Sequence, residues 1–152
     1  MSLSPKKIKT YLLFKLPSAY FTGVRVKSIS ENSCVTTVKH RWINQNPFNS
    51  MFWAVQGIAA ELSTGAIIMQ KIEQSDQKIS MLVANNKASF TKKAKGRISF
   101  SCTDGALVDS AIKKAIHTGE GQTVWLKSEG KDEAGDVVST FEFEWTLKVK
   151  IQ

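Results

Sequence analysis

The chain has 152 residues, enough for one domain with a sizeable core, and its apolar fraction of 42% and charged fraction of 22% are typical of globular proteins. No internal repeat or low-complexity tract is present, which excludes solenoid and fibrous classes. The net charge of +8 indicates either anionic partners or a surface that keeps the protein soluble.

The first twenty residues are basic, without a long apolar core or a small-residue cleavage site. They therefore predict no secretory signal, and we expect a cytoplasmic location. Within them, residues 5–16 place Ile8, Tyr11 and Leu12 near helical spacing, with lysines on the other face. Pro17 is expected to end this helix. The basic amphipathic pattern leaves peripheral attachment to a membrane open as one interpretation.

Residues 22–30 and 34–42 predict two strands because they alternate or are rich in β-branched residues. Cys34 and Cys102 are far apart in the sequence and lack CxxC spacing, and the two histidines are isolated, so no metal site is expected. We predict two buried free thiols, with a disulfide as the alternative.

A polar loop, residues 44–50, leads into an apolar segment, Met51–Gln70, that predicts a buried helix capped by Asn49 or Ser50. Its only charged residue is Glu61. A carboxylate on a buried helix carries a large desolvation cost unless it is paired or protonated, so Glu61 is a candidate for chemistry. The same carboxylate argues against an integral membrane segment.

The rest of the chain predicts strands over 79–90 and 96–103, an amphipathic helix over 104–118 with Leu107 and Ile116 facing inward, and strands over 121–128 and 137–150. The last strand has the cleanest alternation, with five core-facing residues: Phe141, Phe143, Trp145, Leu147 and Val149. One long apolar helix among hairpin-connected strands predicts an α+β fold, in which an antiparallel sheet wraps around the central helix.

The segment Asn46–Ala54, reading NPFNSMFWA, followed by Glu61, resembles the hotdog-fold acyl-CoA thioesterase superfamily, in particular the phenylacetic-acid-degradation thioesterases and a related uncharacterised branch. Members often read N-x-x-G-T-M-x-A-G, then a small apolar stretch, then Glu or Asp. Residues 86–96 are similar to the family's strand and basic turn. The resemblance implies a single hotdog domain over 1–152 with residues 1–19 as an N-terminal helical extension.

The same resemblance implies hydrolysis of an acyl-CoA-type thioester, with coenzyme A as part of the substrate and no other cofactor. Glu61 would act as base or nucleophile, Asn46 would orient substrate or water, and N–H groups around Asn49, Ser50 and Met51 would hold the oxyanion. Hotdog proteins form homodimers or homotetramers, usually with the acyl site at a subunit interface.

Further residues are expected to bind substrate: Met51, Trp53, Gly57, Asn85, Asn86, Lys87, Lys92 and Lys93. The lysines would meet the phosphates of coenzyme A by charge, or else form a solvated turn. Asn85 and Asn86 either line a pocket or satisfy a buried backbone group. A structural alternative for Glu61 is pairing with Asn85, Asn86 or Lys87.

Two departures from the family pattern support an alternative function. Asn49 stands where members often have glycine, and the bulky Trp53 replaces a smaller residue near the acyl channel. The alternative is a non-catalytic hotdog protein that binds fatty acyl ligands or a protein partner. Nucleic-acid binding is disfavoured, because the basic residues are not interleaved with exposed aromatics and no recognition motif is present.

Overall fold

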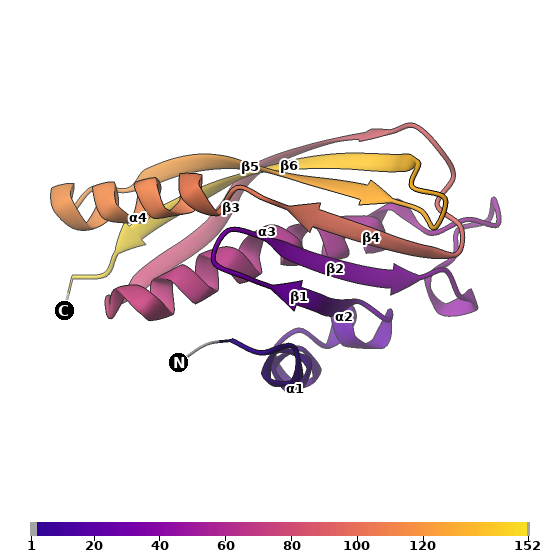
Figure 1. Cartoon of the computed structure of the whole chain (residues 1–152), viewed down its shortest axis with the longest axis horizontal. Helices are drawn as coiled ribbons and strands as arrows, with labels where there is room; N and C mark the ends of the chain where they lie inside the picture. The colour runs from indigo at the N-terminus through magenta and orange to yellow at the C-terminus, as the bar shows by residue number, and fades with distance from the viewer. Residues whose placement is uncertain (1–2, 152) are drawn as a thin grey trace.

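The computed structural model describes residues 3–151. Two short helices, α1 (Pro5–Lys15) and α2 (Pro17–Phe21), precede the strands β1 (Arg25–Ile29) and β2 (Cys34–Lys39). After a 3-10 turn at Trp42–Asn44 comes the long helix α3 (Trp53–Ser75). The chain continues through β3 (Ile79–Phe90), β4 (Arg97–Cys102), α4 (Gly105–Thr118), β5 (Gln122–Lys131) and β6 (Val137–Val149). Figure 1 shows these elements in chain order.

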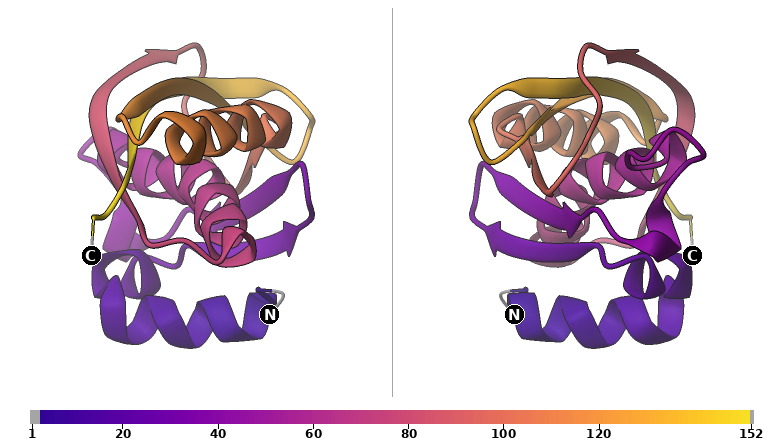
Figure 2. Two further views of the ribbon diagram at one scale, coloured as in Figure 1. Left: turned by 90° about the vertical axis from the view of Figure 1, so that its left-hand side faces the viewer. Right: turned by 90° about the vertical axis from the view of Figure 1, so that its right-hand side faces the viewer.

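The six strands form one antiparallel sheet in the order β1-β2-β4-β5-β6-β3. This sheet curves around α3, which packs against β1, β2, β4, β5 and β6 (Figures 1 and 2). The predicted α+β fold, an antiparallel sheet wrapped around a long central helix, is confirmed. The order leaves β1 and β3 as the two edge strands.

Helix α3 continues past Gln70, where the sequence predicted its end. Lys71 is buried at 5% exposure, and its ammonium lies 2.8 Å from the Asp109 carboxylate and 3.6 Å from that of Glu31. This pairing compensates the desolvation of the lysine, so a charged residue can continue a buried helix. The helix ends only at Asp76, which adopts a left-handed conformation with φ 59°.

The core lies between α3 and the concave face of the sheet. Phe141, Phe143, Trp145 and Leu147 are buried as predicted, and Val149 is half-buried. In α4, Val108, Ala111, Ile112 and Ala115 form the buried stripe. Leu107 and Ile116 are exposed, so their predicted inward orientation was wrong. The reason is that α4 covers α3 and β5 with one narrow stripe only.

Cys34 and Cys102 are direct neighbours in the register of β2 and β4, and both are buried free thiols, as predicted. Burial raises the pKa of each thiol to about 12, which keeps both protonated and unreactive at neutral pH.

Helix α1 docks on the body through Ile8 and Leu12. Across residues 3–151, no helix combines the length and apolarity needed to cross a membrane.

Candidate functional site

The loop before α3 is held by its own side chains. The Asn46 carboxamide oxygen accepts hydrogen bonds from the N–H of Phe48 at 2.9 Å and of Ser50 at 3.2 Å. Its Nδ2 donates to Ser50 Oγ at 3.0 Å and to the Met51 carbonyl at 3.4 Å. Asn46 therefore acts as the organiser of this loop, and its amide has little capacity left for a substrate.

Because the loop uses these groups internally, neither Asn49 nor Ser50 caps α3, and that expectation was wrong. The helix starts at Trp53, and its N-cap residue Phe52 offers no side-chain hydrogen bond. The Met51 N–H donates to the Ala94 carbonyl at 2.9 Å, and the Asn49 N–H donates to the Asn46 carbonyl at 3.3 Å.

The N–H groups of Asn49, Ser50 and Met51, predicted to hold an oxyanion, are therefore all engaged. Within the described residues, the N–H groups of Trp53 and Ala54 at the start of α3 have no hydrogen-bond acceptor. These two groups point along the positive end of the helix dipole and are available to bind a negative oxygen.

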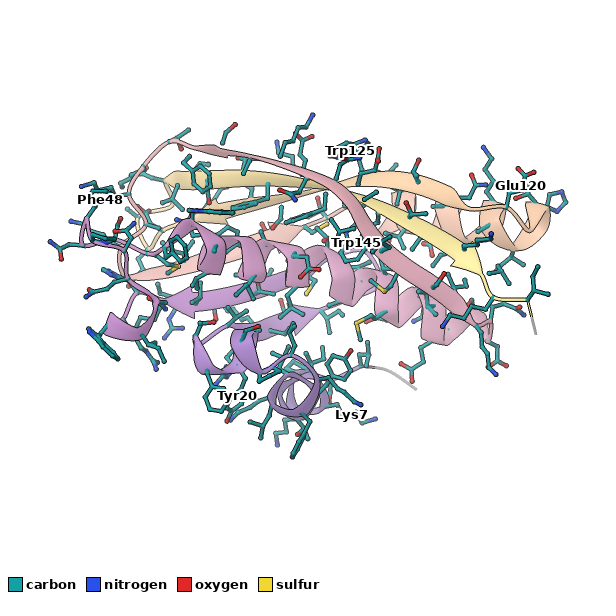
Figure 3. All side chains as sticks on the ribbon, turned by 180° about the vertical axis from the view of Figure 1, so that it is seen from behind. Lys7, Tyr20, Phe48, Glu120, Trp125 and Trp145 are labelled. Carbon is teal, nitrogen blue, oxygen red and sulfur yellow. The ribbon has the colours of Figure 1, made fainter. Side chains whose placement is uncertain are left out.

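A groove of about 430 Å³ opens beside this helix start. It brings together six of the predicted site residues: Asn46, Ser50, Met51, Trp53, Lys92 and Lys93. The remaining walls come from Phe48, Gln56, Phe90, Thr91 and Ala94. Figure 3 shows Phe48 at one end of the molecule, beside the start of α3. Asn49, Gly57 and Glu61 do not line this groove.

Sequence reasoning missed Gln56 as a site residue. Its side chain is buried at 4% exposure, donates to the Met51 carbonyl at 3.3 Å and accepts from Ser139 Oγ at 2.7 Å. It thereby ties the start of α3 to β6 under the groove. The available signal was a carboxamide in the first turn of a mostly apolar segment, since a buried amide requires partners.

Glu61 lies in the third turn of α3 and is half-buried. Burial raises the pKa of its carboxyl group above the ordinary value of 4.5. In the part of the chain that the structure describes, this carboxylate makes no hydrogen bond or ion pair; only its backbone carbonyl is bound, by Thr64 Oγ1 at 2.8 Å. Gly57 and Gly65 lie one turn away on either side of Glu61. Because glycine has no side chain, these positions leave space beside the carboxylate on its face of the helix.

The expected pairing of Glu61 with Asn85, Asn86 or Lys87 was wrong for the single chain. All three residues are exposed on β3. Asn85 donates to the Glu144 carboxylate at 3.0 Å, and Lys87 lies 3.4 Å from Glu142. Their partners come from the facing strand β6, with which β3 is in register.

These same three residues were expected to bind substrate, and the structure places them on β3 outside the groove. The side chains of Asn85 and Asn86 are exposed, so they do not satisfy a buried backbone group.

The two lysines at the groove differ in their ion pairing. The Lys92 ammonium lies 2.6 Å from Asp132 and 2.7 Å from Asp136, and these bonds raise the pKa of Lys92 to about 12. The same contact lowers the pKa of Asp132. Lys92 thus holds the β5–β6 hairpin, while Lys93 is exposed and forms no ion pair with any described residue. Lys93 is the cation left to meet an anionic ligand.

Gly57 packs its Cα against the Phe141 ring; a Cβ at this position would lie 3.5 Å from that ring, an ordinary contact. Trp145 lies against the middle of α3, where its indole N–H donates to Thr64 Oγ1 at 3.0 Å (Figure 3). Among residues 3–151, no cluster of three or more His, Cys, Asp or Glu side chains is placed to bind a metal ion.

Solved structures share this architecture over nearly the whole chain. A Pseudomonas aeruginosa protein of unknown function, described as a probable thioesterase, matches with a TM-score of 0.84 at 21% identity, covering 99% of each chain. A Chlorobaculum tepidum protein of unknown function matches at 0.82 and 15% identity, covering 98% of this chain and 99% of that one. A Haemophilus influenzae thioesterase matches at 0.75 and 11% identity, covering 100% and 95%.

At these identities the likeness shows the fold, and that fold is the hotdog fold of thioesterase-like proteins. The chain belongs to the family described as domain of unknown function DUF4442, which matches residues 5–147. No protein with a curated description matches the sequence.

Proposed function

We propose that the protein hydrolyses an acyl thioester of the acyl-CoA type, with Glu61 as general base or nucleophile. The observation that carries this proposal is a half-buried carboxylate with a raised pKa and without a partner in the described chain. An unpaired carboxylate in such a place reduces stability, and a pKa raised by burial suits a base that must take a proton from water.

The oxyanion of the tetrahedral intermediate would be bound by the free N–H groups of Trp53 and Ala54. In this mechanism Glu61 either removes a proton from the attacking water or attacks the thioester carbonyl itself. In the first route, the tetrahedral intermediate collapses to the free acid, and protonated Glu61 returns the proton to the departing thiolate. In the second route, water supplies the proton to the departing thiolate and then hydrolyses the mixed anhydride, which regenerates the Glu61 carboxylate. No metal or further cofactor enters this proposal.

Geometry favours a site shared between two copies of the chain. Trp53 and Glu61 are eight residues apart on one helix, and at 1.5 Å per residue they are separated by about 12 Å along its axis. A base works within hydrogen-bond distance of the reacting atoms. One thioester carbonyl therefore cannot meet the start of α3 and Glu61 of the same chain. A homodimer or homotetramer would solve this by placing the start of α3 from one copy beside Glu61 of another.

Exposed apolar residues support such an assembly. Trp42 is 82% exposed and Trp53 57% exposed near the start of α3, and Leu82 is exposed on the edge strand β3. Large exposed apolar side chains of this kind are characteristic of association surfaces. In the proposed complex, Lys93 at the groove would meet a phosphate of coenzyme A.

The test is release of coenzyme A from short, long and aromatic acyl-CoAs by the wild type and by Glu61→Gln. Glutamine keeps the size of the side chain and removes the base. We expect turnover by the wild type and a fall of about two to four orders of magnitude in the variant, the usual contribution of a general base. Light scattering on the same samples reports the oligomeric state.

A matched control is Glu73→Gln, which makes the same change at an exposed position of α3. This variant is expected to keep wild-type turnover. Equal turnover by the wild type and Glu61→Gln would contradict the assignment of Glu61. A fully active monomer would contradict the shared site.

The second candidate is a protein that binds acyl thioesters or fatty acyl ligands without hydrolysing them. It is favoured by Trp53, a bulky and largely exposed side chain at the first residue of α3. Saturable binding of acyl-CoA without release of coenzyme A by any substrate would select this alternative.

A further inference from the structure

We propose that helix α1 docks on an anionic phospholipid surface, with a headgroup phosphate between α1 and β1. This inference does not depend on the proposed hydrolysis. It rests on three features of the N-terminal region: the orientation of α1, its uncompensated charge, and a basic cleft at its side.

The orientation of α1 is set by its buried residues. Ile8 and Leu12 attach the helix to the body, so α1 lies along the outside of the molecule, and Figure 2 shows it below α3 at the lower edge of both views. The opposite face then points to solvent. By helical spacing, Lys6, Thr10 and Phe14 lie on that outer face. Lys7 and Tyr11 lie on the flank of α1 that borders α3, where they line a small pocket with Leu62 and Met69.

The charge of this region is of one sign. Lys6, Lys7, Lys9 and Lys15 are exposed on α1, and the first acidic residue of the chain is Glu31. None of these four lysines forms an ion pair with a residue in 3–151. Lys71, Lys87 and Lys92 elsewhere on the molecule are each paired with a carboxylate. The four lysines of α1 are therefore free to bind an anion from outside the chain, in a region without an acidic residue before Glu31.

A cleft of about 310 Å³ lies between α1 and β1, lined by Pro5, Lys6, Lys9, Arg25 and Val26. Arg25 is held in place because its Nη1 donates to the carbonyls of Tyr20 and Val24, each at 2.8 Å, and its guanidinium lies 4.2 Å from the Tyr20 ring centre. Its Nε and Nη2 remain without an acceptor in the described chain. Three cations around one cleft match the chemistry of a phosphate group.

The aromatic residues favour a lipid layer over a protein as the source of that phosphate. Phe14 is 74% exposed on the outer face of α1, which also carries Lys6, and Tyr11 is 44% exposed on the flank toward α3. A protein interface requires an apolar core with a polar rim, whereas single aromatic side chains between cations suit the boundary of headgroups and acyl chains. The exposed aromatic side chains and the unpaired lysines together describe a helix lying in the plane of a membrane surface.

The experiment is sedimentation of the full chain with vesicles of phosphatidylcholine alone and with vesicles that also contain phosphatidylglycerol. We expect binding to the second kind only, weakened by added salt. Lys6→Gln/Lys9→Gln should lower the partition coefficient by about 25-fold, because each lysine near an anionic surface contributes about 1 kcal/mol. Phe14→Ser should lower it by roughly tenfold through lost apolar burial.

Matched controls are available on α4, which lies on the other side of α3 from α1 (Figure 2). Lys113→Gln/Lys114→Gln removes two exposed helix lysines, and Leu107→Ser removes an exposed apolar side chain. Both controls should bind vesicles as the wild type does. All substituted side chains are exposed, so circular dichroism should show unchanged folding.

Three kinds of result would overturn the proposal. The first is a lack of selectivity, seen either as no binding to vesicles with phosphatidylglycerol or as an equal loss of binding in the α4 controls. An equal loss in Lys113→Gln/Lys114→Gln would indicate general charge attraction. The second is displacement from the vesicles by glycerol phosphate at low concentration, which would make the cleft a site for a free phosphate ester. The third is a vesicle-independent oligomer that Phe14→Ser dissociates, because a second copy would then cover α1.

Discussion

The loop before α3 and the turn of α3 that carries Glu61 differ in the hydrogen bonding of their polar side chains. In the loop, the Asn44 and Asn46 carboxamides bond on both sides, donating through Nδ2 and accepting through Oδ1. Two turns into the helix, the Glu61 carboxylate has no partner within residues 3–151. Satisfied buried amides stabilise a fold, whereas a desolvated carboxylate opposes it. Substitutions in the two regions should therefore change stability with opposite signs.

The largest loss is expected for Asn44→Ala. Asn44 is 2% exposed; its Oδ1 accepts from the Arg41 N–H at 2.8 Å, and its Nδ2 donates to the carbonyls of Thr22 and Lys39 at 3.0 and 2.9 Å. Alanine leaves three backbone groups without a partner, so we expect the free energy of unfolding to fall by about 3 kcal/mol. Urea denaturation measures this loss. The exposed neighbour, as Gln45→Ala, should change it by less than about 0.5 kcal/mol.

A smaller loss of about 1–2 kcal/mol is expected for Asn46→Ala, because this loop is half-exposed and water can replace some of the bonds. Urea denaturation again gives the value. If Asn46 acts on the substrate as well, turnover should fall in conditions where the variant is fully folded. Unchanged turnover of the folded variant would leave Asn46 as the organiser of the loop alone.

Most of the fold was predictable because its signals are local. Strand β3 runs from Ile79 to Phe90 as predicted, and β6 buries alternate residues as its pattern indicates. The resemblance to hotdog proteins then predicted correctly how the sheet and the central helix are arranged. The errors concern groups whose partners are distant in sequence. Lys71 pairs with Asp109, so α3 runs longer than expected.

The candidate site was less predictable for the same reason. Lys92 is bound by Asp132, forty residues further along the chain, and Gln56 is bound by Ser139, eighty-three residues away. Neither partner follows from spacing or composition. The Asn46 loop was recognised as a unit because its hydrogen bonds are local. The Met51 N–H, however, donates to the carbonyl of Ala94, which is distant in sequence, so its engagement could not be predicted.

The opposite sign is expected for Glu61→Gln, and it depends on pH. Because burial raises the pKa of Glu61 in the folded state above 4.5, the folded protein binds more protons than the unfolded chain between 4.5 and that raised pKa. Wild-type stability attributable to Glu61 therefore falls as pH rises through this window, and the full penalty remains above it. Glutamine is uncharged throughout and carries no such penalty.

The difference in unfolding free energy between Glu61→Gln and the wild type should thus become more positive as pH rises from 4.5 and then level off above the raised pKa of Glu61. Urea denaturation of both proteins at several pH values measures it, with Glu73→Gln on the exposed face of α3 as the control for a change of charge. A difference that does not vary with pH would mean that the Glu61 carboxylate is as well solvated in the fold as in the unfolded chain. In an oligomer in which a second copy supplies a partner to Glu61, the gain would shrink or reverse, so the same measurement on the isolated assembly also reports whether this carboxylate is completed across an interface.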